Sequence, residues 1–92
     1  SKGGIVGLTL PAARELARFG IRVMAIAPGA VSTPMIGEIS QELQDSIAAG
    51  VPFPPRMANP DEFARLALHI IQNNYLNGSV IRLDGAARLA AK

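Results

Sequence analysis

The sequence has no cysteine and no tryptophan, and only one histidine and one tyrosine among its 92 residues. Without cysteine, neither a disulfide-stabilised scaffold nor a thiolate metal site can form. A single histidine also excludes a metal site built from several histidines. We therefore expect no metal in the functional site.

The sequence has little charge of either sign. Charged residues make up 17% of the chain, the net charge is +2, and no basic run or aromatic cluster accompanies the arginines. These features give little support to nucleic-acid binding. No stretch approaches the ~20 apolar residues of a membrane span, and no secretory signal is visible. We expect an intracellular protein, or a piece of one, with no nucleic-acid or membrane partner.

Apolar residues fill 49% of the sequence, which argues against intrinsic disorder. Their helical spacing predicts helices over residues 2–18, 38–48 and 60–73. The continuous apolar run at 23–27 predicts a strand over 21–27, and β-branched residues predict a second strand over 79–83. The predicted order is therefore helix, strand, helix, helix, strand.

Several residues are typical of the ends of these elements. Gly20 is well placed to end the first helix, while Asn59 and Pro60 suit the N-cap and first position of the last helix. Asn77 and Gly78 predict a turn, and Asp84 reads as a turn-forming aspartate.

The first helix has an unusually wide apolar surface. Two neighbouring stripes run along it, and such a width predicts packing on two sides, one of them toward another subunit. The first stripe contains Ile5, Leu8, Ala12, Ala13 and Leu16, and the second contains Val6, Leu10 and Ala17.

The strand over 21–27 does not alternate between apolar and polar residues. Such strands are covered on both faces, as in the parallel sheets of α/β proteins, and the two strands with the helices between them predict a right-handed crossover. Two parallel strands alone do not make a stable sheet. We therefore expect residues 1–92 to be an α/β chain, the C-terminal fragment of a doubly wound parallel-sheet (Rossmann-like) domain whose dinucleotide-binding half lies outside it.

Three stretches carry a family resemblance: SK opening a helix at residues 1–2, PGAVST at 28–33 after a strand, and NGSVIRLDG at 77–85. In this order and spacing they resemble the C-terminal portion of the short-chain dehydrogenase/reductase family. Within it, the chain is most similar to the 3-hydroxyacyl-CoA dehydrogenases. The resemblance implies an oxidoreductase that interconverts a secondary alcohol and a ketone with NAD.

The family's catalytic pair is a tyrosine and a lysine four residues later, and Lys2 matches that lysine. The matching tyrosine would precede Ser1, and Tyr75 does not fit the motif. A base working near pH 7 needs the phenol pKa lowered by about three units, or ~4 kcal/mol. An ammonium about 4 Å away at an effective dielectric near 20 supplies about that much. In the family this lysine also holds the nicotinamide ribose.

The resemblance also implies a cofactor site after the first strand. Ligands of open α/β sheets bind at the carboxyl ends of the strands. The family places Pro28, Gly29, Val31 and Thr33 there, with Val31 and Thr33 against the nicotinamide. The plainer alternative is an ordinary turn with surface hydroxyls.

Residues 34–57 would then form the substrate loop. Apolar residues in it suit an acyl-CoA or another apolar alcohol or ketone under a mobile lid, although a helix packing its own apolar face explains them equally well. The resemblance further implies a homo-oligomer, a dimer or tetramer, in a bacterial cytoplasm or a mitochondrion.

Two other functions remain open. The first alternative is a non-catalytic assembly module or remnant. The second is part of a 3-oxoacyl reductase of the same family. In all cases the 92 residues alone are expected to be inactive, because the tyrosine and the phosphate-binding turn lie outside them.

Overall fold

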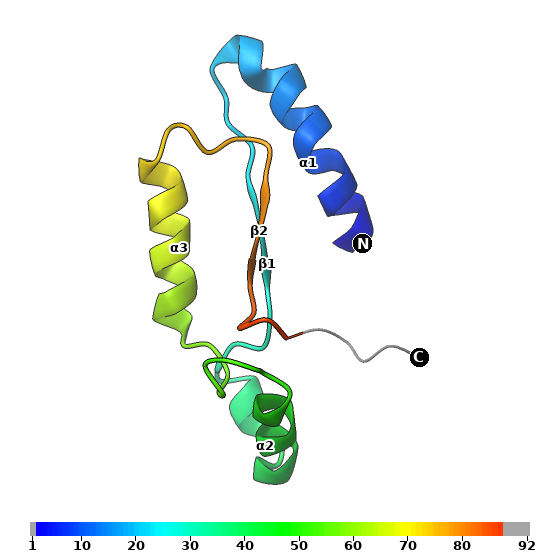
Figure 1. Cartoon of the computed structure of the whole chain (residues 1–92), viewed down its shortest axis with the longest axis vertical. Coiled ribbons are helices and arrows are strands. Elements are labelled where there is room, and N and C mark those ends of the chain that lie inside the picture. Colours follow the sequence, from blue (N-terminus) through cyan, green and yellow to red (C-terminus); the bar gives the residue numbers. More distant parts are fainter. Residues whose placement is uncertain (1, 88–92) are drawn as a thin grey trace. The chain divides into compact units, whose positions relative to one another are not determined.

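The computed structural model describes residues 2–87, and the side chains of 3–87. The helices and strands follow the predicted order, and β1 and β2 pair in a parallel two-stranded sheet (Figure 1). The predicted α/β class is thereby confirmed. The elements are α1 (Lys2–Leu16), a 3₁₀ turn (Ala17–Phe19), β1 (Ala25–Pro28), a 3₁₀ turn (Ile36–Glu38), α2 (Gln41–Ala49), α3 (Pro60–Gln72) and β2 (Val80–Leu83).

The described chain forms two compact units. Unit 1 contains residues 2–27 and 65–82, and unit 2 contains residues 28–64 and 83–87. Unit 1 holds α1 and most of α3, and unit 2 holds α2 with the loops around it.

In unit 1, α1 and α3 lie on opposite sides of the strands (Figure 1). The buried line of α1 runs through Thr9 and Ala13, which are 4% and 2% exposed, whereas Ile5 and Leu8 of the predicted stripe are exposed. Gly78 contributes to the difference, because a Cβ there would lie 3.3 Å from that of Ala13 and 3.0 Å from Cδ1 of Leu10. The turn therefore approaches α1 at Leu10 and Ala13, and not at Ile5 or Leu8.

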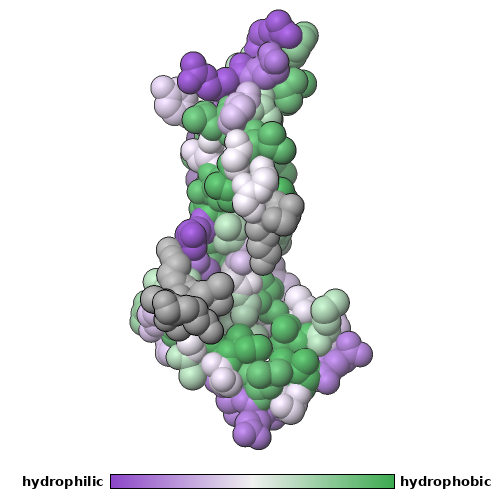
Figure 2. All heavy atoms as spheres, turned by 90° about the vertical axis from the view of Figure 1, so that its right-hand side faces the viewer, coloured by the Kyte–Doolittle hydropathy of each residue, from purple (hydrophilic) through white to green (hydrophobic). Residues whose placement is uncertain are grey.

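Large apolar side chains remain on the outer surface of α1, where Figure 2 shows hydrophobic atoms along the helix. Ile5, Val6, Leu8 and Leu10 are each more than half exposed. Packing of this helix on a second side stays a prediction. Among residues 2–87, no helix is both long and apolar enough to cross a membrane.

The first strand is shorter than predicted, beginning at Ala25 rather than residue 21. Upstream of the strand, the Val23 N–H donates to Oδ1 of Asn77 at 2.9 Å, and the Val23 carbonyl accepts from the Gly78 N–H at 2.8 Å. Val23 therefore bonds to the predicted turn instead of a neighbouring strand, while the Ile21 N–H donates to Leu16. The ladder starts where the Ala25 N–H donates to the Ser79 carbonyl.

Helix ends follow local chemistry. Gly20 ends the first helical segment in the left-handed conformation, with φ +73°, as predicted. The predicted helix over 38–48 is α2 at 41–49 instead. Its boundary is set by Ser40, whose hydroxyl accepts from the Leu43 N–H at 3.1 Å and caps the first turn.

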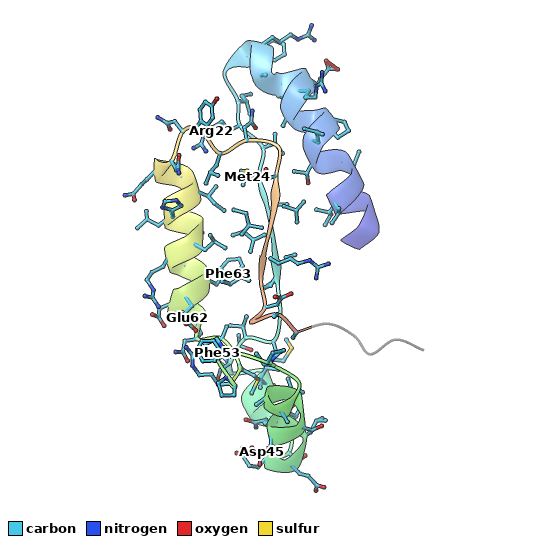
Figure 3. The ribbon with its side chains drawn as sticks, viewed as in Figure 1. Arg22, Met24, Asp45, Phe53, Glu62 and Phe63 are labelled. Atoms are coloured by element: carbon cyan, nitrogen blue, oxygen red, sulfur yellow. The ribbon has the colours of Figure 1, made fainter. Side chains whose placement is uncertain are left out.

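The C-terminal end of α3 is held by Arg22, a residue to which sequence reasoning assigned no role (Figure 3). Its guanidinium donates to the carbonyl oxygens of Ile70, Ile71, Asn73 and Leu76 over 2.8–3.2 Å. Helix C-termini leave carbonyls without intrahelical partners, and one planar cation satisfies several of them here.

Candidate functional site

The loop at residues 28–33, which we call the 28–33 loop, lies in unit 2 and begins where β1 ends at Pro28. The Gly29 N–H donates to the carbonyl of Leu83 at 2.9 Å. A Cβ on Gly29 would come within 2.8 Å of the Cβ of Asp84, closer than real side chains approach. A glycine is therefore required for the loop to leave the sheet in this position.

Val31 forms an isolated parallel bridge with Ala58. The two hydrogen bonds of the bridge belong to its neighbours: the Ala58 N–H donates to Ala30 at 3.0 Å, and the Ser32 N–H donates to Ala58 at 2.8 Å. In such a pairing the central residue turns its own groups to the opposite side. Within residues 2–87, the Val31 N–H and carbonyl have no partner, so this residue presents one free donor and one free acceptor.

Thr33 adds a third polar group to the same loop. Its carbonyl accepts from the Gly37 N–H at 3.1 Å, which turns the chain into the following 3₁₀ segment. Its side chain is exposed, and its hydroxyl makes no hydrogen bond within the described part of the chain.

These groups together match a primary carboxamide. A carboxamide offers an acceptor oxygen and an NH₂ with two donors. The Val31 N–H can meet the oxygen, while the Val31 carbonyl and the Thr33 hydroxyl can meet the NH₂. The residues present therefore fit the amide end of a nicotinamide.

Lys2 is the first residue of α1 and belongs to unit 1. Its side chain lies outside the described residues, so its catalytic role stays a prediction. The structure groups Pro28, Gly29, Val31 and Thr33 in one loop of unit 2, while Lys2 is part of the other unit.

Next to the 28–33 loop, unit 2 has an open hollow of about 80 Å³. Ligand pockets for drug-sized molecules are several-fold larger, so this hollow alone does not hold an acyl-CoA. Met35 and Phe53, both at least three-quarters exposed, provide apolar surface in the same unit. The lining of the hollow includes Ala30, Val51, Pro54, Ala58, Asp84 and Gly85.

An ion pair fixes the segment that carries Ala58. The guanidinium of Arg56 donates to both carboxylate oxygens of Glu62, over 2.8 and 3.0 Å. The same carboxylate accepts from the Asn59 N–H at 2.8 Å, so it also caps the start of α3. The hydrogen bond and the charge of Glu62 raise the pKa of Arg56 above its ordinary value.

The sequence does not predict the pairing of Ala58 with Val31, because an alanine in a loop gives no local signal of its partner.

The chain matches the family described as Enoyl-(Acyl carrier protein) reductase over residues 1–86. It belongs to the short-chain dehydrogenase/reductase family. The resemblance drawn from the three sequence stretches is thereby confirmed.

Among members of this family, the chain is 55% identical to 3-hydroxyacyl-CoA dehydrogenase type-2 of Bos taurus, an alignment that covers 97% of the chain and 34% of the relative. The crystal structure of 3-hydroxyacyl-CoA dehydrogenase type-2 from Mycobacterium avium matches with a TM-score of 0.92 and 48% identity, over 99% of the chain and 35% of that protein. The chain thus spans about a third of the relatives it matches.

A reductase of the same family is also similar. The crystal structure of a 3-oxoacyl-(acyl-carrier protein) reductase from Brucella melitensis matches with a TM-score of 0.86 and 31% identity, over 97% of the chain and 34% of that protein. These short-chain dehydrogenase/reductase relatives are all oxidoreductases, and the structural neighbours share the predicted Rossmann-like fold.

Proposed function

We propose that this chain is the C-terminal part of an NAD-dependent oxidoreductase that interconverts a secondary alcohol and a ketone, with a 3-hydroxyacyl-CoA as substrate. One observation carries the proposal: the free donor and acceptor of Val31, with the Thr33 hydroxyl, stand in the loop after a parallel strand. That is the edge at which open α/β sheets bind their ligands.

The 28–33 loop holds the nicotinamide end of the cofactor. Val31 binds the carboxamide through its N–H and carbonyl, and Thr33 adds its hydroxyl. These bonds orient the ring, so that one face is presented to the substrate. Pro28 and Gly29 start the loop tight against β2, where Gly29 meets Asp84. When bound, the oxidised nicotinamide supplies the hydride acceptor, and the alcohol also releases one proton.

Lys2 governs the proton. Its ammonium, one helical turn from a tyrosine four residues upstream, favours the phenolate and lets the tyrosine accept the proton of the alcohol near pH 7. The same ammonium binds the nicotinamide ribose hydroxyls, so Lys2 is both a catalytic and a cofactor-binding residue. The tyrosine position precedes Ser1.

The substrate class is supported by sequence identity and by apolar surface. The 55% identity is to a dehydrogenase named for 3-hydroxyacyl-CoA. The exposed side chains of Met35, Leu43 and Phe53 offer cover for an acyl chain when residues 34–57 close as a lid.

Assembly and location belong to the same proposal. We propose that residues 1–92 form part of a single domain, and that the exposed apolar side chains of α1 pack in a homodimer or homotetramer. The relatives include animal and bacterial proteins, which supports either a mitochondrial or a bacterial cytoplasmic location.

A second candidate is a 3-oxoacyl reductase, which would run the same chemistry toward the alcohol. It is favoured by the similarity to the Brucella melitensis reductase and by 36% identity to a Thermotoga maritima 3-oxoacyl-(acyl-carrier-protein) reductase. The reductase differs from the dehydrogenase in its acyl carrier, which is a carrier protein in place of CoA. Assays with each cofactor also separate NAD from its phosphorylated form.

The deciding experiment uses the complete protein that carries this chain. Turnover is followed by cofactor absorbance with 3-hydroxybutyryl-CoA and NAD, and in reverse with acetoacetyl-CoA or an acetoacetyl carrier protein and each reduced cofactor. We expect kcat/KM to be highest for the CoA substrates with NAD and its reduced form. A preference for the carrier protein with NADPH selects the reductase, and no turnover with either set overturns the oxidoreductase proposal.

A further inference from the structure

The end of β2 and the turn that follows it contact both the 28–33 loop and residues 51–53 of unit 2. The carbonyl of Leu83, the last residue of β2, accepts from the Gly29 N–H at 2.9 Å. The next residue, Asp84, lies so close to Gly29 that a Cβ on that glycine would come within 2.8 Å of its own. The carbonyl of Gly85 accepts from the Phe53 N–H at 3.3 Å. We call residues 84–87 the 84–87 turn; it contacts the 28–33 loop through Asp84 and residues 51–53 through Gly85.

The 84–87 turn has its own internal support. A side-chain oxygen of Asp84 accepts from the Ala86 N–H at 3.0 Å, and its carbonyl accepts from the Ala87 N–H at 3.0 Å. Gly85 and Ala86 are both left-handed, with φ +59° and +68°. A hydrogen bond from the backbone N–H to an aspartate side chain two residues earlier stabilises a turn locally. The conformation of the 84–87 turn is therefore set by its own residues, and the neighbouring segments pack against it.

Both contacts with the turn are close enough to require glycine. A Cβ on Gly85 would lie 2.5 Å from Cγ1 of Val51 and 3.1 Å from the carbonyl oxygen of Phe53. A Cβ on Gly29 would lie 2.8 Å from the Cβ of Asp84. Val51 is 8% exposed and has little room to move aside. Because neither glycine has a side chain, the backbone of the 84–87 turn lies in close contact with the 28–33 loop and with residues 51–53. A shift of the turn therefore moves both segments.

We propose that the 84–87 turn positions the substrate segment, residues 51–53, relative to the 28–33 loop. Gly85 is the positioning residue for the substrate side, and Gly29 for the cofactor side. This inference rests on the proposed function. Hydride transfer needs the reacting atoms at near-contact distance, and a misplacement of about 1 Å can cost a hundredfold in rate. One turn that contacts both binding segments keeps that spacing constant.

The test uses Gly85→Ala in the complete protein. The added methyl displaces Val51 and Phe53, so KM for 3-hydroxybutyryl-CoA should rise roughly tenfold or more, while Kd for NAD stays within about twofold. Gly29→Ala should give the converse, a weakened NAD affinity with a smaller effect on substrate. If Gly85→Ala raises both constants by the same factor, the division of roles is wrong.

Gly20→Ala is the matched control for backbone strain. Gly20 has φ +73°, but nothing lies within 4 Å of the Cβ it would gain. It therefore imposes a left-handed alanine without a collision, and both constants should stay within about twofold of wild type. A tenfold rise of KM in Gly20→Ala as well would assign the effect to strain and overturn the proposal.

A rescue variant keeps the test valid if Gly85→Ala folds poorly. Val51→Ala removes the γ-carbon that lies closest to the new methyl, while the Phe53 carbonyl stays in place, so the double variant should regain folding and part of the substrate affinity. A double variant that regains neither folding nor any substrate affinity overturns the collision argument.

Hydrogen exchange gives a readout that needs no activity. The Phe53 amide donates to Gly85, and its exchange should rise about tenfold in Gly85→Ala while amides in α3 are unchanged. Unaltered exchange at Phe53 overturns the proposal. Absence of both turnover and NAD binding in the wild type would refute the proposed function, whereas the exchange result still decides whether the turn positions residues 51–53.

Discussion

The guanidinium of Arg22 lies 2.8 Å from the carbonyl oxygen of Ile70, 48 residues later in the chain. Its second terminal nitrogen lies 2.9 Å from the carbonyl of Ile71. A residue just before β1 thereby caps the helix that precedes β2. This long-range bond stabilises unit 1, in which only three described residues, Thr9, Ala13 and Ile70, are buried.

Arg22→Met should destabilise the protein by about 2 kcal/mol, because hydrogen bonds to a charged group are lost and helix carbonyls lose their partners. Urea unfolding of the complete protein measures this. Arg22→Lys keeps the charge without the planar fork and should recover only part of the loss. Arg18→Met is the control, since Arg18 is exposed and makes weak surface contacts, with a carboxylate oxygen of Glu15 at 3.8 Å and the ring of Phe19 at 4.9 Å. A loss as large as that of Arg22→Met would contradict the capping role.

Glu62→Ala should cost about 1 kcal/mol of stability, because it removes the bond to the Asn59 N–H at the start of α3. Glu62→Gln keeps an acceptor there and should cost less. Arg56→Met should have a smaller effect that fades with added salt, since the ion pair is partly exposed. Thermal unfolding at low and high salt separates the two contributions, and equal effects of all three variants would contradict this division.

Lys2→Met should lower kcat at pH 7 by about a thousandfold, because the tyrosine pKa is expected to return upward by about three units. The removed charge is positive and favours the phenolate, so the rising limb of the kcat–pH profile should move to higher pH. Lys2→Arg retains the charge and should leave the profile nearer its original position. An unshifted profile in Lys2→Met rules out this role for Lys2.

Thr33→Val should raise the Kd for NAD about fivefold, because it replaces one hydroxyl hydrogen bond worth about 1 kcal/mol with a methyl of similar shape. Isothermal titration on the complete protein measures the change. Ser32→Ala is the neighbouring control, because Ser32 bonds to Ala58 through its backbone N–H, which the substitution keeps. Equal losses in the two variants would remove Thr33 from the cofactor site.

The purified 92-residue chain should show no dehydrogenase activity with 3-hydroxybutyryl-CoA and NAD. The tyrosine and the glycine-rich phosphate turn expected for the reaction are not among its residues. The complete protein, assayed in parallel, is the positive control. Turnover by the short chain, with the complete protein excluded as a contaminant by mass spectrometry, would show that the reaction needs neither group.

The sequence by itself determined the order of helices and strands, the start of α3 at Pro60 and the ending of α1 near Gly20. It also determined the family, through three motifs in register. These features depend on neighbouring residues: apolar spacing, the fixed φ of proline and the left-handed freedom of glycine all act over a few positions.

Only the tertiary structure decided which side of α1 is buried, where β1 begins and what Arg22 and Ala58 do. Each of these depends on a residue far away in the chain: Gly78 beside Ala13, Asn77 beside Val23, the carbonyls of α3 beside Arg22. Close approaches and hydrogen bonds between distant segments arise when the chain packs, and the residues around one position do not identify its distant partner. For that reason the free N–H and carbonyl of Val31 are evident from its bridge to Ala58, and not from the motif that contains Val31.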